Sequence, residues 1–276
     1  MIYNKIKILG RVNEAFASRG WRDSGNEILR ISEQLSQGVS TQKVVKAISG
    51  KFLLANSIKR QDIVPVLDRV LHEKDILQLD TSSPIKLLFT YSTPSDVPPL
   101  RLGTEEKQIK EALRAITDRD KIHIDTIPAV ELKDFSNAFN RYKPNILHIS
   151  SHGNQECIAL ENEKGDAIAV DDDTLMNIVK LAGKQLKIVV LNACESSKMA
   201  ASLTDVVDIA IGMNVSIGDD AARAFAVQLY SSIGENIPIG LAFEQAKFAI
   251  SANGISEADA PVLHYRKGIH PEKYQL

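Results

Sequence analysis

Two apolar stretches decide the fold, KIVVLNACESS at Lys187 to Ser197 and NILHISSHG at Asn145 to Gly153. Each is a short run of mostly branched apolar residues followed by polar ones. This pattern is typical of a strand that is buried on both faces and then emerges at the edge of a sheet. One stretch ends on a cysteine, and the other ends on a histidine and a glycine. We therefore expect two parallel strands whose tips carry reactive side chains.

Predicted strands alternate with predicted helices from residue 81 onward. The strands are expected at 85–90, 122–127, 146–150, 186–192 and 209–213, and the helices at 104–116, 132–142, 174–181, 197–203, 220–233 and 241–252. Two apolar runs around Lys164-Gly165-Asp166 predict a hairpin. The alternation predicts an α/β fold with a mainly parallel sheet flanked by helices. Ligands of such sheets bind beyond the carboxyl ends of the strands.

Residues 1–80 carry only helical signals and predict a small all-α bundle of four or five helices. Apolar residues recur there at spacings of three and four, among them Ile28, Ile31 and Leu35. The polar segment DTSSP, Asp80 to Pro84, ends any helix before it. We therefore expect two domains, 1–80 and 81–276.

Charge and composition exclude several classes of protein. The formal net charge is −2, with 13 basic and 9 acidic residues in 1–80 (+4), which leaves −6 for the remainder. This balance, without a dense basic run, does not favour nucleic-acid binding. No apolar run reaches the length of a membrane span, and the first residues lack the pattern of a secretion signal. We expect a cytoplasmic protein with reduced thiols and no membrane partner.

The two strand tips supply a candidate nucleophile and base. A thiol becomes a nucleophile when an imidazole takes its proton, and Cys194 and His152 form one such pair if their strands are neighbours. Gly153 follows the histidine, and its backbone N–H together with that of Cys194 is a candidate oxyanion hole. His148 is expected to be a core histidine, and Cys157 a structural thiol in the hairpin. No ligand cluster or phosphate loop suggests a metal or an organic cofactor.

These residues resemble a known family. The series LHISSHG, VVLNACES, the strand IAIGM and the helix DDAARAFAVQLY is similar to the CHAT domain, a bacterial branch of the caspase, metacaspase and separase clan. The resemblance runs from about residue 84 to about residue 266. It implies a caspase-like fold and a cysteine endopeptidase whose catalytic dyad is His152 and Cys194, with the Gly153 backbone in the oxyanion hole.

The family also implies partners. CHAT proteins are often fused or paired with sensors in bacterial antiviral or stress systems and, once activated, cut partner proteins. The helical domain 1–80 is similar in placement to the death-like or effector-associated adaptors of such systems. The resemblance thus implies a protein substrate, a sensor or adaptor that engages residues 1–80, and possible oligomerisation on activation.

One position departs from the family pattern. Relatives that cut after Arg or Lys carry an Asp two residues before the nucleophile, where this chain has Asn192. A basic substrate residue is therefore not assured, although Glu195 or Asp219 are candidates for supplying the missing charge. The alternative for Asp219 is a helix N-cap.

Two other functions compete with the protease. The first is a catalytically inactive caspase-like scaffold that serves only assembly. The second is a Cys-His amidase or acyltransferase that acts on small substrates.

Overall fold

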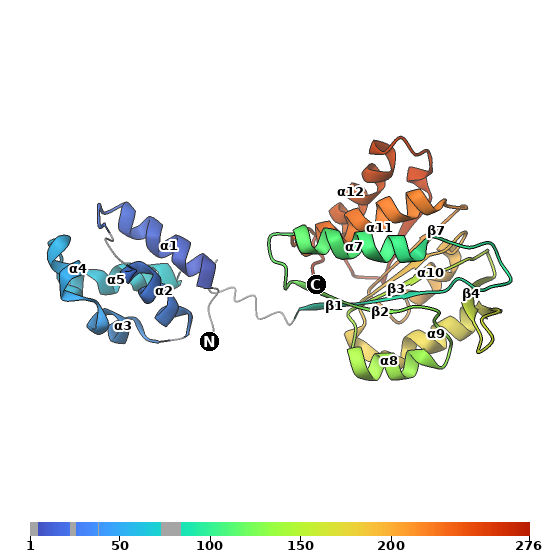
Figure 1. Cartoon of the computed structure of the whole chain (residues 1–276), viewed down its shortest axis with the longest axis horizontal. Coiled ribbons are helices and arrows are strands. Elements are labelled where there is room, and N and C mark those ends of the chain that lie inside the picture. Colours follow the sequence, from blue (N-terminus) through green and yellow to red (C-terminus); the bar gives the residue numbers. More distant parts are fainter. Residues whose placement is uncertain (1–4, 23–25, 38, 73–83) are drawn as a thin grey trace. The chain divides into compact units, whose positions relative to one another are not determined.

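The computed structural model describes residues 5–22, 26–37, 39–72 and 84–276. It divides the chain into two compact units, Met1–Ser83 and Pro84–Leu276 (Figure 1). Of the predicted polar break Asp80 to Pro84, only Pro84 lies within the described residues. No helix in the described ranges combines the length and the apolar content needed to cross a lipid bilayer.

The first unit is helical in its described part. Its helices are α1 (Lys5–Ala17), α2 (Glu27–Ser36), α3 (Thr41–Ala47), α4 (Gly50–Ala55) and α5 (Arg60–His72). The apolar positions with helical spacing in the sequence form the core of this unit. Ile31 is 2 % exposed and Leu35 is fully buried, and both pack in one cluster with residues of the other helices. Helical periodicity alone therefore predicted which faces are buried.

The second unit is built on a six-stranded sheet with the order β2-β1-β3-β6-β7-β8. The strands are β1 (Ile85–Tyr91), β2 (Ile122–Ile127), β3 (Ile146–Ser150), β6 (Ile188–Asn192), β7 (Ile209–Met213) and β8 (Pro261–Tyr265). The strands from β1 to β7 in this sheet pair in parallel, and β8 pairs antiparallel with β7. Every residue of β3 and β6 is buried, as expected of central parallel strands. The mainly parallel α/β fold is thus confirmed.

Helices cover both faces of this sheet (Figure 1). On one face lie α7 (Leu102–Ala115), α11 (Asp219–Gly234) and α12 (Ile239–Ala252), and on the other lie α8 (Asp134–Tyr142), α9 (Asp172–Leu181) and α10 (Ser197–Leu203). Short 3₁₀ turns occupy Gly183–Gln185 and Glu257–Asp259. Two separate apolar clusters lie between the sheet and the helices, one on each face, and the sheet separates them.

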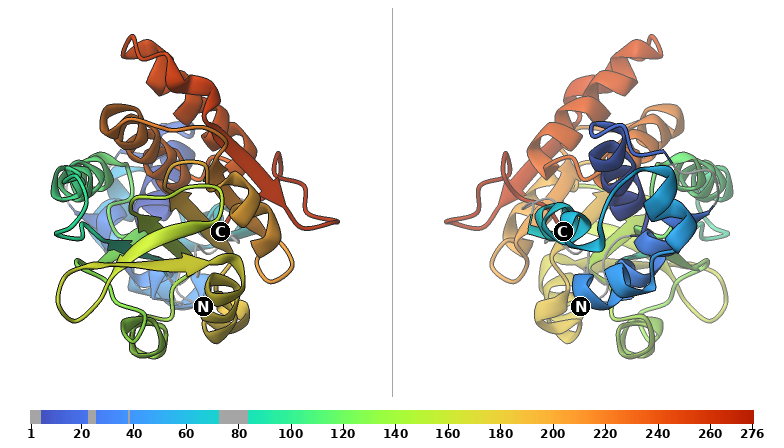
Figure 2. Two further views of the ribbon diagram at one scale, coloured as in Figure 1. Left: turned by 90° about the vertical axis from the view of Figure 1, so that its right-hand side faces the viewer. Right: turned by 90° about the vertical axis from the view of Figure 1, so that its left-hand side faces the viewer.

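A hairpin interrupts the path from β3 to β6. Strands β4 (Cys157–Glu161) and β5 (Ala167–Asp171) pair antiparallel, as predicted, and appear in yellow-green and yellow in the left view of Figure 2. The turn of the hairpin holds the loop 92–101, which joins β1 to α7. Ser95 N donates to Gly165 O at 2.8 Å, and Ala167 N donates to Asp96 Oδ1 at 2.8 Å. The hairpin therefore fixes the position of a loop that is distant in sequence.

Candidate active site

The register of β3 and β6 brings the two strand tips together. Ser150 pairs with Asn192 in the parallel ladder, and Ser151 N donates to Asn192 O at 3.4 Å. His152 and Cys194 each follow two residues after this pair, so they emerge at the same edge of the sheet. Both line one pocket, whose other lining residues are Leu100, Arg101, Leu102, Glu105, Ser150, Ser151, Asn192, Ala193, Ile217, Asp219 and Ala222.

Gly153 lies where the two tips approach most closely. A Cβ at this position would be 2.9 Å from Ala193 Cβ and 2.9 Å from Cys194 O, distances that real Cβ atoms do not show. Among the hydrogen bonds of the described residues, neither the Gly153 N–H nor the Cys194 N–H has an acceptor. The two strand tips therefore each carry a backbone donor that is unpaired within the described part of the chain, Gly153 N–H on one and Cys194 N–H on the other.

The ring of His152 is oriented by a backbone carbonyl. Its Nε2 lies 2.7 Å from Pro98 O, in the loop 92–101. A carbonyl only accepts hydrogen bonds, so Nε2 carries the proton and Nδ1 of the neutral ring is left as the acceptor. The role of Pro98 was not predictable from the sequence, because every residue type has a backbone carbonyl.

Cys194 is partly exposed at the pocket. Its Sγ lies 3.8 Å from Ile217 O, and the next residue, Glu195, has the left-handed φ of 56°. Helix α10 begins at Ser197, three residues beyond the cysteine. Both cysteines are free thiols. Cys157 lies in β4 and does not line the pocket.

Only two of the three predicted substrate-binding residues line the pocket. Asn192 and Asp219 line the pocket, whereas Glu195 does not. The alternative role of Asp219 as an N-cap is wrong, because Gly218 occupies the N-cap position of α11 and Asp219 is the first residue of the helix. The Asp219 side chain instead accepts a hydrogen bond from Arg101 N at 3.1 Å, at the start of α7.

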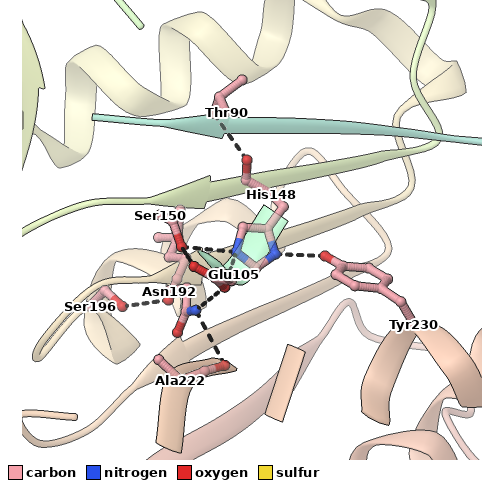
Figure 3. Close-up of polar contacts among 9 residues, drawn as sticks. Thr90, Glu105, His148, Ser150, Asn192, Ser196, Ala222 and Tyr230 are labelled. Atoms are coloured by element: carbon pink, nitrogen blue, oxygen red, sulfur yellow. Dashed lines mark hydrogen bonds and ion pairs between the residues drawn. The ribbon is translucent and has the colours of Figure 1, made fainter. Parts of the chain in front are cut away.

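A buried polar network that the sequence did not reveal includes three residues of the pocket lining, Glu105, Ser150 and Asn192 (Figure 3). Ser150 Oγ donates to Glu105 Oε2 at 2.7 Å, and Asn192 Nδ2 donates to Glu105 Oε1 at 2.7 Å. His148 is fully buried, as predicted, with Nε2 3.2 Å from Ser150 Oγ and Nδ1 2.7 Å from Tyr230 Oη. Burial, followed by the nearby charge of Glu105, holds the pKa of Tyr230 well above its usual value, so the hydroxyl keeps its proton.

A sequence signal for Glu105 did exist. Leu102, Glu105, Ile109 and Leu113 recur at spacings of three and four, which places the carboxylate on the apolar face of α7. All four are buried. Glu106, the next residue, does not line the pocket. Burial alone would raise the pKa of its carboxyl, but the hydrogen bond and the charge of Lys110 outweigh burial and lower that pKa. The described residues contain no group of three or more His, Cys, Asp or Glu side chains placed to hold a metal ion.

Comparisons with known proteins agree with the family resemblance. Over 237 residues the chain is 27 % identical to a "Roc-COR-CHAT protease" from an unknown prokaryotic organism, covering 83 % of the chain and 22 % of that protein. Over 150 residues it is 27 % identical to a "Probable protease" of Gillisia limnaea, covering 53 % of the chain and 26 % of that protein. The chain therefore spans about a quarter of the length of these curated relatives.

Two solved structures are also similar. A secreted C11 cysteine protease from Bacteroides thetaiotaomicron matches with a TM-score of 0.48 and 11 % identity, over 65 % of the chain and 66 % of that protein. Caspase-1 from Spodoptera frugiperda matches with a TM-score of 0.45 and 9 % identity, over 68 % of the chain and 92 % of that protein. The model of the CHAT domain family matches residues 24–262, which is more than half of the sequence. The chain belongs to the CHAT domain family.

Proposed function

We propose that the chain is a cysteine endopeptidase in which Cys194 is the nucleophile and His152 is the general base and acid. The observation that carries this proposal is the common pocket at the matched ends of β3 and β6, which both side chains line. The free state of Cys194 and its partial exposure are consistent with a reactive thiol.

The proposed reaction uses only groups of this chain and water. His152 Nδ1 takes the Cys194 proton while Nε2–H stays on Pro98 O, and the thiolate attacks the peptide carbonyl carbon. The N–H groups of Gly153 and Cys194 stabilise the oxygen that becomes negative. His152 then protonates the amine as the C–N bond breaks. It next takes a proton from the water that attacks the thioester, and it returns this proton to the Cys194 sulfur as the C–S bond breaks.

The experiment that tests this function is the incubation of the full chain with a peptide library, with the cut sites identified by mass spectrometry. We expect internal peptide bonds to be cut, and a peptide-based electrophile to become attached to Cys194. Reaction of a small amide analogue in the absence of any peptide cleavage would contradict the endopeptidase and favour an amidase.

The helical unit is the proposed regulatory part. It has its own apolar core, separate from the two clusters of the second unit, so it is suited to bind a partner without forming part of the pocket. We propose that an upstream sensor or adaptor engages residues 1–80, in bacterial antiviral defence or stress signalling, with oligomerisation as one means of activation. The substrates are then partner proteins in the cytoplasm.

This regulation predicts that the purified chain alone is a weak enzyme. Its kcat/KM on the best library peptide should fall below about 10⁴ M⁻¹ s⁻¹, the lower end of the usual enzyme range. Initial rates over a series of peptide concentrations give this value. A kcat/KM well above that limit, with no partner added, would argue against control through residues 1–80.

A further inference from the structure

Two hydrogen-bond acceptors lie among the buried residues that line the pocket. Glu105 is 3 % exposed and Asn192 is 6 % exposed, and both line the pocket together with His152 and Cys194. They come from different elements, Glu105 from α7 and Asn192 from the end of β6. The question is which chemical group these acceptors fit.

The orientation of the Asn192 amide is fixed by its partners (Figure 3). Its nitrogen faces two acceptors, Glu105 Oε1 at 2.7 Å and Ala222 O at 3.5 Å, so the nitrogen and the oxygen cannot be exchanged. The remaining atom, Oδ1, is buried and has no donor within the described structure. Buried carbonyl oxygens are normally paired, so Asn192 Oδ1 lacks the donor that such an oxygen usually has.

Both oxygens of Glu105 accept hydrogen bonds, one from Ser150 Oγ and one from Asn192 Nδ2. Tyr230 donates to His148 Nδ1, His148 Nε2–H donates to Ser150 Oγ, and Ser150 donates to Glu105 Oε2. Every proton in this series has an acceptor when the ring of His148 is neutral.

No full positive charge compensates Glu105 within the described residues. His148 Nε2 lies 3.4 Å from Glu105 Oε1, and the hydrogen-bond donors to the carboxylate are the neutral Asn192 and Ser150. A carboxylate offers about four acceptor sites, so further donors can bind. Arg101 and Asp219 also line the pocket, and their formal charges cancel. The formal net charge of the lining is therefore the negative charge of Glu105.

We propose that this pocket binds a positively charged side chain, that of an arginine or a lysine, in the substrate residue before the scissile bond. Glu105 supplies the counter-charge, and Asn192 Oδ1 accepts one further hydrogen bond. A guanidinium has five N–H donors in a fixed plane and can reach a carboxylate and a carbonyl together, so arginine fits best. Some family members carry an Asp two residues before the nucleophile, where this chain has Asn192. In this chain the negative charge comes instead from Glu105, in helix α7. This inference rests on the proposed protease function.

The test compares two peptides that differ only in charge, one with arginine and one with citrulline before the cut bond. Citrulline keeps the shape of arginine and lacks its charge. The full chain should cleave the arginine peptide with a kcat/KM about 10- to 100-fold higher, the range of a charge-assisted hydrogen bond. In Glu105→Gln this ratio should fall to near one.

Glu106→Gln is the matched control, because Glu106 is the neighbouring carboxylate of the same helix and does not line the pocket. It should keep the arginine preference. An equal preference for both peptides in the unaltered chain would overturn the inference, whether or not Glu105→Gln folds. Asp219→Asn tests the other acidic residue of the lining, and loss of the preference there instead of in Glu105→Gln would also overturn it. If neither peptide is cut and the electrophile leaves Cys194 unmodified, the protease proposal itself fails.

Discussion

Replacing Cys194 by alanine should abolish peptide cleavage, lowering kcat/KM by about 10³-fold or more, while the folded state keeps its stability. The substitution removes the atom that forms the bond to the substrate, and no other side chain can take its place. Cys194 is partly exposed at a strand tip, so the loss of its sulfur leaves no core cavity. Cleavage rates and thermal unfolding of the same preparation measure the two effects.

Cys157 provides the matched control for this change. It is the other free thiol, it lies in β4 outside the pocket, and its Sγ contacts Asn154 Oδ1 at 3.6 Å. Cys157→Ala should therefore cleave at the normal rate. If Cys194→Ala leaves every measurable activity unchanged, the chain is a scaffold with a caspase-like fold, and the catalytic proposal must be given up.

Replacing Gly153 by alanine should lower kcat by about 10²- to 10³-fold, with a small change in KM. The added Cβ would lie 2.9 Å from Cys194 O and from Ala193 Cβ, so the backbone of one tip must shift. Such a shift moves the N–H of Gly153 away from the oxyanion, and the loss of one such donor costs about 2.7–4 kcal/mol of transition-state stabilisation. Steady-state kinetics on one peptide separate kcat from KM.

Gly103→Ala is the control for the added methyl group. Gly103 lies in α7, and a Cβ there meets no atom within 4 Å. Alanine is the better helix former, so this variant should be as active as the unaltered chain and as stable or more stable. Full activity of Gly153→Ala would mean that the Gly153 N–H has no part in the reaction.

The sequence predicted the strands that carry the pocket because their signal is local. The residues of β3 and β6 are all buried and mostly apolar, and the polar residues after them mark where each strand leaves the core. It did not predict β8, which begins with Pro261 and buries only that residue fully. Such an edge strand gains its place by pairing with β7, and sequence alone does not show a partner.

The rest of the pocket depended on contacts between distant segments. His152 and Cys194 were identified from the strand ends, but Pro98 O reaches the histidine only because the loop 92–101 folds over it. Glu105 resembled a solvated residue, since the helix that carries it is rich in charge. Its periodicity with Leu102 and Ile109 was the available clue, and a buried carboxylate on an apolar face marks a specific partner.

The geometry of the pocket depends on residues of the hairpin that do not line it. Gly165 O accepts a hydrogen bond from Ser95 N, and Ala167 N donates to the side chain of Asp96. The Pro98 carbonyl that orients His152 therefore depends on a hairpin that follows it by many positions in the chain. A random screen for inactive variants should therefore recover changes in that hairpin. Plotted along the sequence, these substitutions would form a second cluster far from His152 and Cys194, although they act by changing the orientation of the His152 ring.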